Sequence, residues 1–147
     1  MKSGGIKVEL QLLRNNASAF KKSAERSLEQ RQLINGQIEF YAVPAAVNLA
    51  FSIELYLKYL LTKNSKNKKP CRGHNLLDLF NSLDSTIKQE IVKITGYNEE
   101  EFKILLSKHA EAFVEWRYIY ERNKSISVNI EFMRKLIDCV ESVVNRS

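Results

Sequence analysis

The stretch VPAAVNLAFSIELYLKYLLTK, residues 43–63, decides the fold because it is apolar on almost every side when wound into a helix. Such a helix is normally covered by its neighbours, so we predict that it is the central helix of a bundle. The polar residues that interrupt it are Asn48, Ser52, Glu54 and Lys58. Glu54 and Lys58 are four residues apart and therefore share one helix face. Burying this pair is costly unless other polar groups meet it, so the function depends on what the pair faces.

Length and composition predict one helical domain. The chain has 147 residues, which suffices for one hydrophobic core and is too short for two ordinary domains, so we predict a single domain over residues 1–147. Hydrophobic residues make up 44%, with only five Gly and two Pro, which is typical of a compact helical chain. Cys71 and Cys139 lie far apart, and the N-terminus lacks a signal-peptide core, so we expect a cytoplasmic protein. Two charges near the middle of residues 41–61 argue against a membrane span.

The net charge of +6 is concentrated in one loop. Residues 62–73 contain five basic residues and no acidic one; the basic residues are Lys63, Lys66, Lys68, Lys69 and Arg72. Such a loop suits a polyanion such as RNA. The alternative is a solvated loop that keeps the chain soluble, and the absence of aromatic residues between the basic ones favours this second interpretation.

Apolar residues three or four apart and capping residues predict the other helices. A first helix covers about residues 6–33 and ends near Gly36. After the central helix, short helices cover about residues 75–83 and 85–96. A long helix then runs from Asn98 to about Arg122, and the last helix follows Asn129. The predicted fold is all-α, an up-and-down helical bundle of four long helices plus one or two short helices.

The predicted fourth helix carries a second unusual feature. His109, Phe113, Arg117 and Glu121 recur at every fourth residue, which places Arg117 beside the apolar face and lets it pair with Glu121. If this helix packs on the central one, Arg117 can also meet Glu54. A buried ionic cluster that fixes the helix register is one interpretation. The other is a guanidinium poised to bind a phosphate.

The two histidines and the cysteines do not form a recognisable metal motif. His74 stands at a predicted helix start, where a capping or loop hydrogen bond is its ordinary role. Cys71, His74 and His109 have no standard metal-ligand spacing, and the sequence contains no phosphate-binding or dinucleotide-binding loop. We therefore predict neither a metal nor a cofactor.

Three segments, taken in order, resemble the HEPN domain family. They are SIELYLKYLL at residues 52–61, GHNLLDLF at residues 73–80 and FVEWRYIYE at residues 113–121. The resemblance implies a helical bundle that often dimerises. Many members of this family are metal-independent ribonucleases of toxin–antitoxin, phage-defence and RNA-processing systems, and others are inactive binding modules.

The resemblance also assigns roles to residues. In active members an Arg is followed four to six residues later by a His, often as Arg-Asn and then His, and the site is completed across a dimer. By this resemblance Glu54 is the polar residue of the central helix and Arg117 the candidate Arg. No His follows Arg117, or Arg122-Asn123, at that spacing. RNA cleavage without a metal needs a general base as well as a cation, and the expected base is missing.

Three hypotheses follow, and they leave open whether the chain is an enzyme. The first is a non-catalytic HEPN-like homodimer that binds RNA, a nucleotide or a protein partner in a bacterial defence or toxin–antitoxin setting. The second is a divergent metal-independent ribonuclease that uses Arg117 with His74 or His109, with Glu54 as the third candidate catalytic residue. The third is a purely structural or interaction bundle. The candidate binding residues are Lys58, Glu121, Tyr118, Lys66, Lys68, Lys69 and Arg72.

Overall fold

The computed structural model describes residues 2–29, 31–32, 38–39, 42–64, 73–110 and 129–147. Six helices and two short strands lie in this part of the chain. Their order is α1 (Lys2–Ser27), β1 (Arg31–Gln32), β2 (Ile38–Glu39), α2 (Ala42–Asn64), α3 (Leu76–Asn81), α4 (Ser85–Thr95), α5 (Glu99–Lys108) and α7 (Ile130–Arg146). The predicted all-α helical bundle is therefore confirmed.

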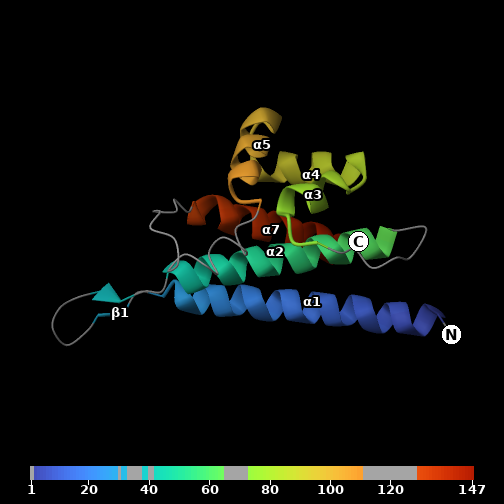
Figure 1. Ribbon diagram of the computed structural model, residues 1–147, viewed down its shortest axis with the longest axis horizontal. Coiled ribbons are helices and arrows are strands. Elements are labelled where there is room, and N and C mark those ends of the chain that lie inside the picture. Colours follow the sequence, from blue (N-terminus) through green and yellow to red (C-terminus); the bar gives the residue numbers. More distant parts are fainter. Residues whose placement is uncertain (1, 30, 33–37, 40–41, 65–72, 111–128) are drawn as a thin grey trace.

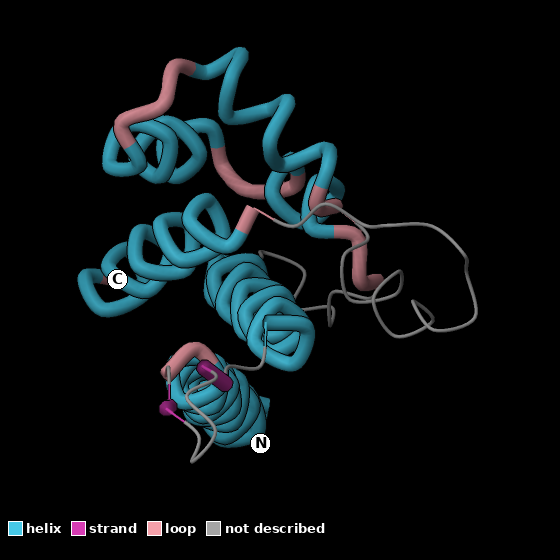
Figure 2. Tube along the Cα trace, turned by 90° about the vertical axis from the view of Figure 1, so that its left-hand side faces the viewer, coloured by secondary structure: helices cyan, strands magenta, loops and turns pink. Residues whose placement is uncertain are grey.

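The helices are stacked in three layers, with α2 in the middle. Figure 1 shows α1 and α2 side by side along most of their length, with the short helices α3, α4 and α5 on the other side of α2. The end-on view of Figure 2 shows α7 beside α2, between α1 and the short helices. The two strands pair antiparallel, Arg31 with Glu39 and Gln32 with Ile38, between α1 and α2.

The apolar sequence of α2 is buried on nearly all sides, as predicted for a central helix. Leu49, Ile53 and Leu60 are each 0% exposed. On α1, Ala17 and Ala24 are also 0% exposed, and such small side chains allow two helix backbones to approach closely. At this contact the buried hydroxyl of Ser52 donates to the Ala17 carbonyl, at 2.6 Å. None of the described helices is long and apolar enough to cross a membrane.

Asparagine side chains start three of the helices. Asn75, Asn98 and Asn129 each accept a hydrogen bond from the backbone N–H three residues later, which caps α3, α5 and α7. Gly96 ends α4 with a positive φ of 81°, a conformation that glycine adopts without steric cost. The predicted positions of these helix ends are confirmed.

Two predicted helix ends are wrong. The first helix ends at Ser27 rather than near residue 33, because residues 31–32 and 38–39 pair as strands instead. The helix that begins after Asn98 ends at Lys108 rather than near Arg122. His109 has φ −109° and ψ 8°, and the carbonyl of the next residue, Ala110, accepts a hydrogen bond from the N–H of Leu76 at 2.8 Å. Of the predicted four-residue row, only His109 is among the described residues, and it lies just past the end of α5; Phe113, Arg117 and Glu121 lie outside them.

Candidate functional site

Glu54 is a carboxylate inside the apolar core helix. It lies near the middle of α2 and its side chain is only 2% exposed. A carboxylate at such a position is stable only if its oxygens are hydrogen-bonded or paired with cations. The partners of Glu54 therefore define the candidate site.

Two nitrogen groups meet this carboxylate from different parts of the chain. Lys58, one turn later on α2, places Nζ 3.3 Å from Oε2 of Glu54. His74, which precedes α3, places Nδ1 3.0 Å from Oε1 of Glu54. Each carboxylate oxygen thus has its own partner, and we call Glu54, Lys58 and His74 the Glu54 cluster.

Local structure holds His74 over α2. Gly73 has a positive φ of 116°, which turns the chain just before the histidine. The next residue, Asn75, caps α3 through its side-chain bond to the N–H of Asp78, at 3.0 Å. His74 therefore lies between a glycine turn and a helix cap, and both restrict where its side chain can go.

The Glu54 cluster connects the core to the surface. The carboxylate is buried, but the side chain of His74 is 57% exposed and that of Lys58 is 16% exposed. An ionised carboxylate only accepts hydrogen bonds, so Nδ1 of His74 is the donor in this contact. A carboxylate that orients an exposed histidine and a partly exposed lysine can serve either anion binding or proton transfer.

His109 lies away from this cluster, in the core. It is 3% exposed, its Nδ1 is 2.8 Å from the carbonyl of Leu105, and its Nε2 is 3.1 Å from the backbone N of Asn129. A carbonyl only accepts and an N–H only donates, so Nδ1 carries the proton and Nε2 accepts. The imidazole therefore joins the end of α5 to the start of α7, which is a structural role.

A second polar network crosses the bundle and was missed by the sequence analysis. The hydroxyl of Tyr56 on α2 donates to Oε2 of Glu141 on α7, at 2.7 Å. Lys21 on α1 reaches both Glu141 and Asp138, with each N–O distance 2.9 Å. In the sequence, only Tyr56 points to this network, because a tyrosine on a buried helix normally needs a hydrogen-bond partner for its hydroxyl.

Burial and pairing move the pKa values of this network in opposite directions. Burial acts to raise the pKa of Glu141, but hydrogen bonds from Lys21 and Tyr56 outweigh it and hold that pKa below its ordinary value. Burial acts to lower the pKa of Lys21, but its bonds with Asp138 and Glu141 raise that pKa overall. Burial, and then the bond to Glu141, raise the pKa of Tyr56. The network is therefore one lysine shared by two carboxylates, with a neutral phenol donor, and it ties three helices together.

Acid should weaken the bundle through Glu141. Its folded pKa is lowered, so its contribution to the free energy of unfolding is present above about pH 4.5 and is lost as the pH falls through the lowered pKa. We expect Glu141→Gln to destabilise the protein at neutral pH and to flatten the fall in stability toward acid. Urea unfolding at a series of pH values measures this, with Glu9→Gln, a change at an exposed carboxylate of α1, as the matched control. Equal pH slopes for the wild type and Glu141→Gln would contradict the assignment.

Several predicted site residues lie outside the described residues. They are Arg117, Tyr118, Glu121, Lys66, Lys68, Lys69 and Arg72. The structure therefore brings together Glu54, Lys58 and His74 from the predicted set.

Cys139 is buried in the core on α7, and burial raises the pKa of its thiol. Within the described part of the chain, no group of three or more His, Cys, Asp or Glu side chains could hold a metal ion.

Comparison with known proteins identifies the family. A family model described as HEPN domain matches residues 10–147. No curated protein and no solved structure matches the chain significantly. The match includes the segments of α2 and of the α3 start that carry the Glu54 cluster. The chain therefore belongs to the HEPN domain family.

Proposed function

We propose that this HEPN domain binds RNA or a nucleotide through phosphate contacts at the Glu54 cluster, without cleaving it. The observation that carries the proposal is that one buried carboxylate holds an exposed histidine and a partly exposed lysine. The ammonium group of Lys58, and Nε2–H of His74 when the imidazole is protonated, are donors oriented in advance that suit a phosphate. The cost of burying Glu54 is offset by these same contacts, so the carboxylate serves as the anchor of the site.

The charge of the chain supports a polyanionic ligand. The net charge is +6, and the five basic residues between Lys63 and Arg72 connect the end of α2 to His74 in the sequence. Phosphate contacts by such residues release counterions, so binding should weaken steeply with salt. Arg117 and the basic residues of this loop complete the proposed phosphate-binding set.

Family membership supports the remaining parts of the proposal. The resemblance implies a homodimer in a bacterial defence or toxin–antitoxin setting, with a protein partner as the other class of ligand, and the two cysteines far apart in sequence favour a cytoplasmic location. A purely structural role is a further alternative, in which Lys58 and His74 serve only to satisfy the carboxylate of Glu54.

A metal-independent ribonuclease is the second candidate, and one observation favours it. Glu54 fixes the proton of His74 on Nδ1, which is how a carboxylate orients a histidine that acts through Nε2 as a general base. In this reaction Nε2 would take the proton of the ribose 2′-hydroxyl, and the 2′-oxygen would attack the adjacent phosphorus to form a 2′,3′-cyclic phosphate. The bond from phosphorus to the 5′-oxygen would break, and the 5′-oxygen would take a proton from water. Arg117 would stabilise the phosphate charge. His109 does not qualify as the base, since both of its ring nitrogens bond to backbone groups in the core.

Incubation of purified protein with single-stranded RNA in EDTA, followed by a denaturing gel, separates the two candidates. We expect intact RNA with the wild type, and with His74→Ala and Arg117→Ala. Cleavage by the wild type that both substitutions abolish would replace the binding proposal by the ribonuclease. The matched control is Lys108→Ala, an exposed position on α5 outside the cluster, which should leave either result unchanged.

A further inference from the structure

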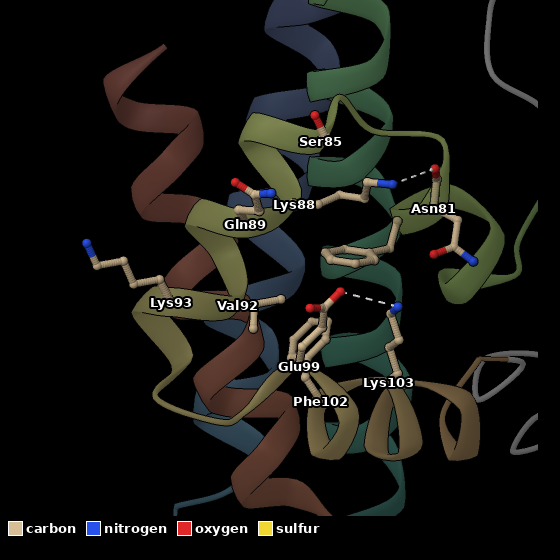
Figure 3. A pocket seen from close by; sticks show the side chains of 10 residues that line it. Asn81, Ser85, Lys88, Gln89, Val92, Lys93, Glu99, Phe102 and Lys103 are labelled. Atoms are coloured by element: carbon tan, nitrogen blue, oxygen red, sulfur yellow. Dashed lines mark hydrogen bonds and ion pairs between the residues drawn. The ribbon is translucent and has the colours of Figure 1, made fainter.

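A pocket lies between α3, α4 and α5, and the Glu54 cluster does not contribute to it. Its volume is about 390 Å³, near the lower end of the range for small-molecule sites. Figure 3 shows the pocket from close by, with side chains of all three short helices around it. A pocket of this size admits a small molecule.

The floor of the pocket is apolar and fixed. Phe80 from α3 and Phe102 from α5 are 3% and 0% exposed, with ring centroids 5.0 Å apart. Val92 on α4 lines one wall. Rings that are already packed on each other do not need to rearrange when a ligand enters, which lowers the cost of binding.

The rim of the pocket is basic. Lys88, Lys93 and Lys103 line it together with a single carboxylate, that of Glu99. Figure 3 shows Lys88 and Lys103 reaching toward the same side of the pocket from α4 and α5, while Lys93 points away from it. An anion at that side would meet two ammonium groups.

The carboxylate of Glu99 already pairs with one of these lysines at the rim. Oε1 of Glu99 is 3.3 Å from Nζ of Lys103, and these side chains are 75% and 58% exposed. An ion pair this exposed contributes little to stability, so it can be exchanged for another carboxylate. Among the described residues, Nζ of Lys88 contacts the carbonyl of Asn81, at 3.4 Å.

We infer that this pocket binds a small apolar carboxylic acid. The apolar body lies over Phe80 and Phe102, against Val92 and the methylene stems of the lysines. The carboxylate lies between Lys88 and Lys103 and takes the place of Glu99. The apolar floor favours this ligand over a bare phosphate, which has no apolar part to bury. The two ammonium groups favour it over a neutral hydrocarbon, which has no charge to pair with them.

The test compares 2-naphthoate with the neutral 2-naphthalenemethanol, which keeps the ring system and removes the charge. Titration followed by amide NMR shifts should give one-to-one binding of 2-naphthoate, with shifts confined to α3, α4 and α5. We expect the alcohol, and the doubly substituted variant K88Q/K103Q with 2-naphthoate, each to bind about tenfold more weakly. Lys108→Gln also removes a lysine charge from α5, but outside the pocket, and should leave the affinity for 2-naphthoate unchanged.

Three results would overturn the inference. One is equal affinity for the acid and the alcohol, and another is a set of shifts that maps outside the three short helices. The third is unchanged binding in Val92→Trp, which places a large side chain in the pocket, provided that circular dichroism shows the fold to be intact. The result does not depend on whether the Glu54 cluster binds RNA.

Discussion

Phe132→Ala should lower the free energy of unfolding by about 3–5 kcal/mol, the usual range when a fully buried aromatic ring is removed. Phe132 is 0% exposed and lies at the start of α7. Its ring centroid is 5.9 Å from that of Tyr97, 6.0 Å from that of Phe102 and 5.6 Å from that of His109. The residue therefore joins α7 to the turn after α4 and to both ends of α5, and its loss leaves a cavity among them.

Urea unfolding followed by far-ultraviolet circular dichroism measures this loss. The matched control is Ile104→Ala on α5, where the side chain is 52% exposed, and its effect should stay within about 0.5 kcal/mol. If Phe132→Ala lowers the free energy of unfolding by less than about 1 kcal/mol, this ring does not hold α7 against the short helices.

His109→Ala should cost about 3 kcal/mol, because it leaves two partly buried backbone groups without their side-chain partner and opens a cavity beside Phe132. The substitution should also loosen the structure locally, at the start of α7. The N–H of Asn129 donates to Nε2 of His109 in the wild type, so its hydrogen exchange should accelerate in the variant.

Amide hydrogen exchange read by NMR, combined with urea unfolding, checks both parts of this prediction. Lys108→Ala, at the neighbouring exposed position, should change the free energy of unfolding by less than about 0.5 kcal/mol. Unchanged exchange at Asn129 in His109→Ala would show that the histidine does not hold the start of α7.

The central helix and the helix starts could be predicted from the sequence because their signals are local. Residues 43–63 are apolar on almost every side of a helix, and α2 is found as Ala42–Asn64. Asn98 and Asn129 act within three residues of themselves, so the chain nearby contains all that the cap requires. The identification of Glu54 as a residue needing partners followed from the same local pattern.

The end of α5 could not be predicted, since its cause is distant in the sequence. The helical pattern continues past Lys108, but His109 bonds to Asn129, twenty residues away, and Ala110 bonds to Leu76. The network of Tyr56, Glu141 and Lys21 has the same origin, because its members lie on three helices with no common motif. Pairings of this kind are decided by how helices pack and not by the residues near each partner.

The candidate site, too, could be predicted from the sequence only in part. Its anchor on α2 and its histidine before α3 were both singled out in the sequence, and the structure brings them together at 3.0 Å. The roles of Arg117 and of the basic loop stay predictions, because these residues lie outside the described ranges. The pocket of α3, α4 and α5 left no sequence signal, since its floor comes from ordinary core phenylalanines.

RNA binding by Glu54→Gln tests the central claim most directly, because the claim and simple electrostatics predict opposite results. Removing a negative charge makes the protein more positive, so undirected attraction to RNA should grow stronger. If Glu54 holds Lys58 and His74 in place for a phosphate, the affinity should instead fall, by about tenfold. The measurement is fluorescence anisotropy of a labelled single-stranded RNA at fixed salt, with Glu131→Gln on α7 as the control that removes an exposed carboxylate. Weaker binding in Glu54→Gln alone, with the fold intact by circular dichroism, is the predicted result. Unchanged or tighter binding in Glu54→Gln, as expected for the control Glu131→Gln, would contradict the account.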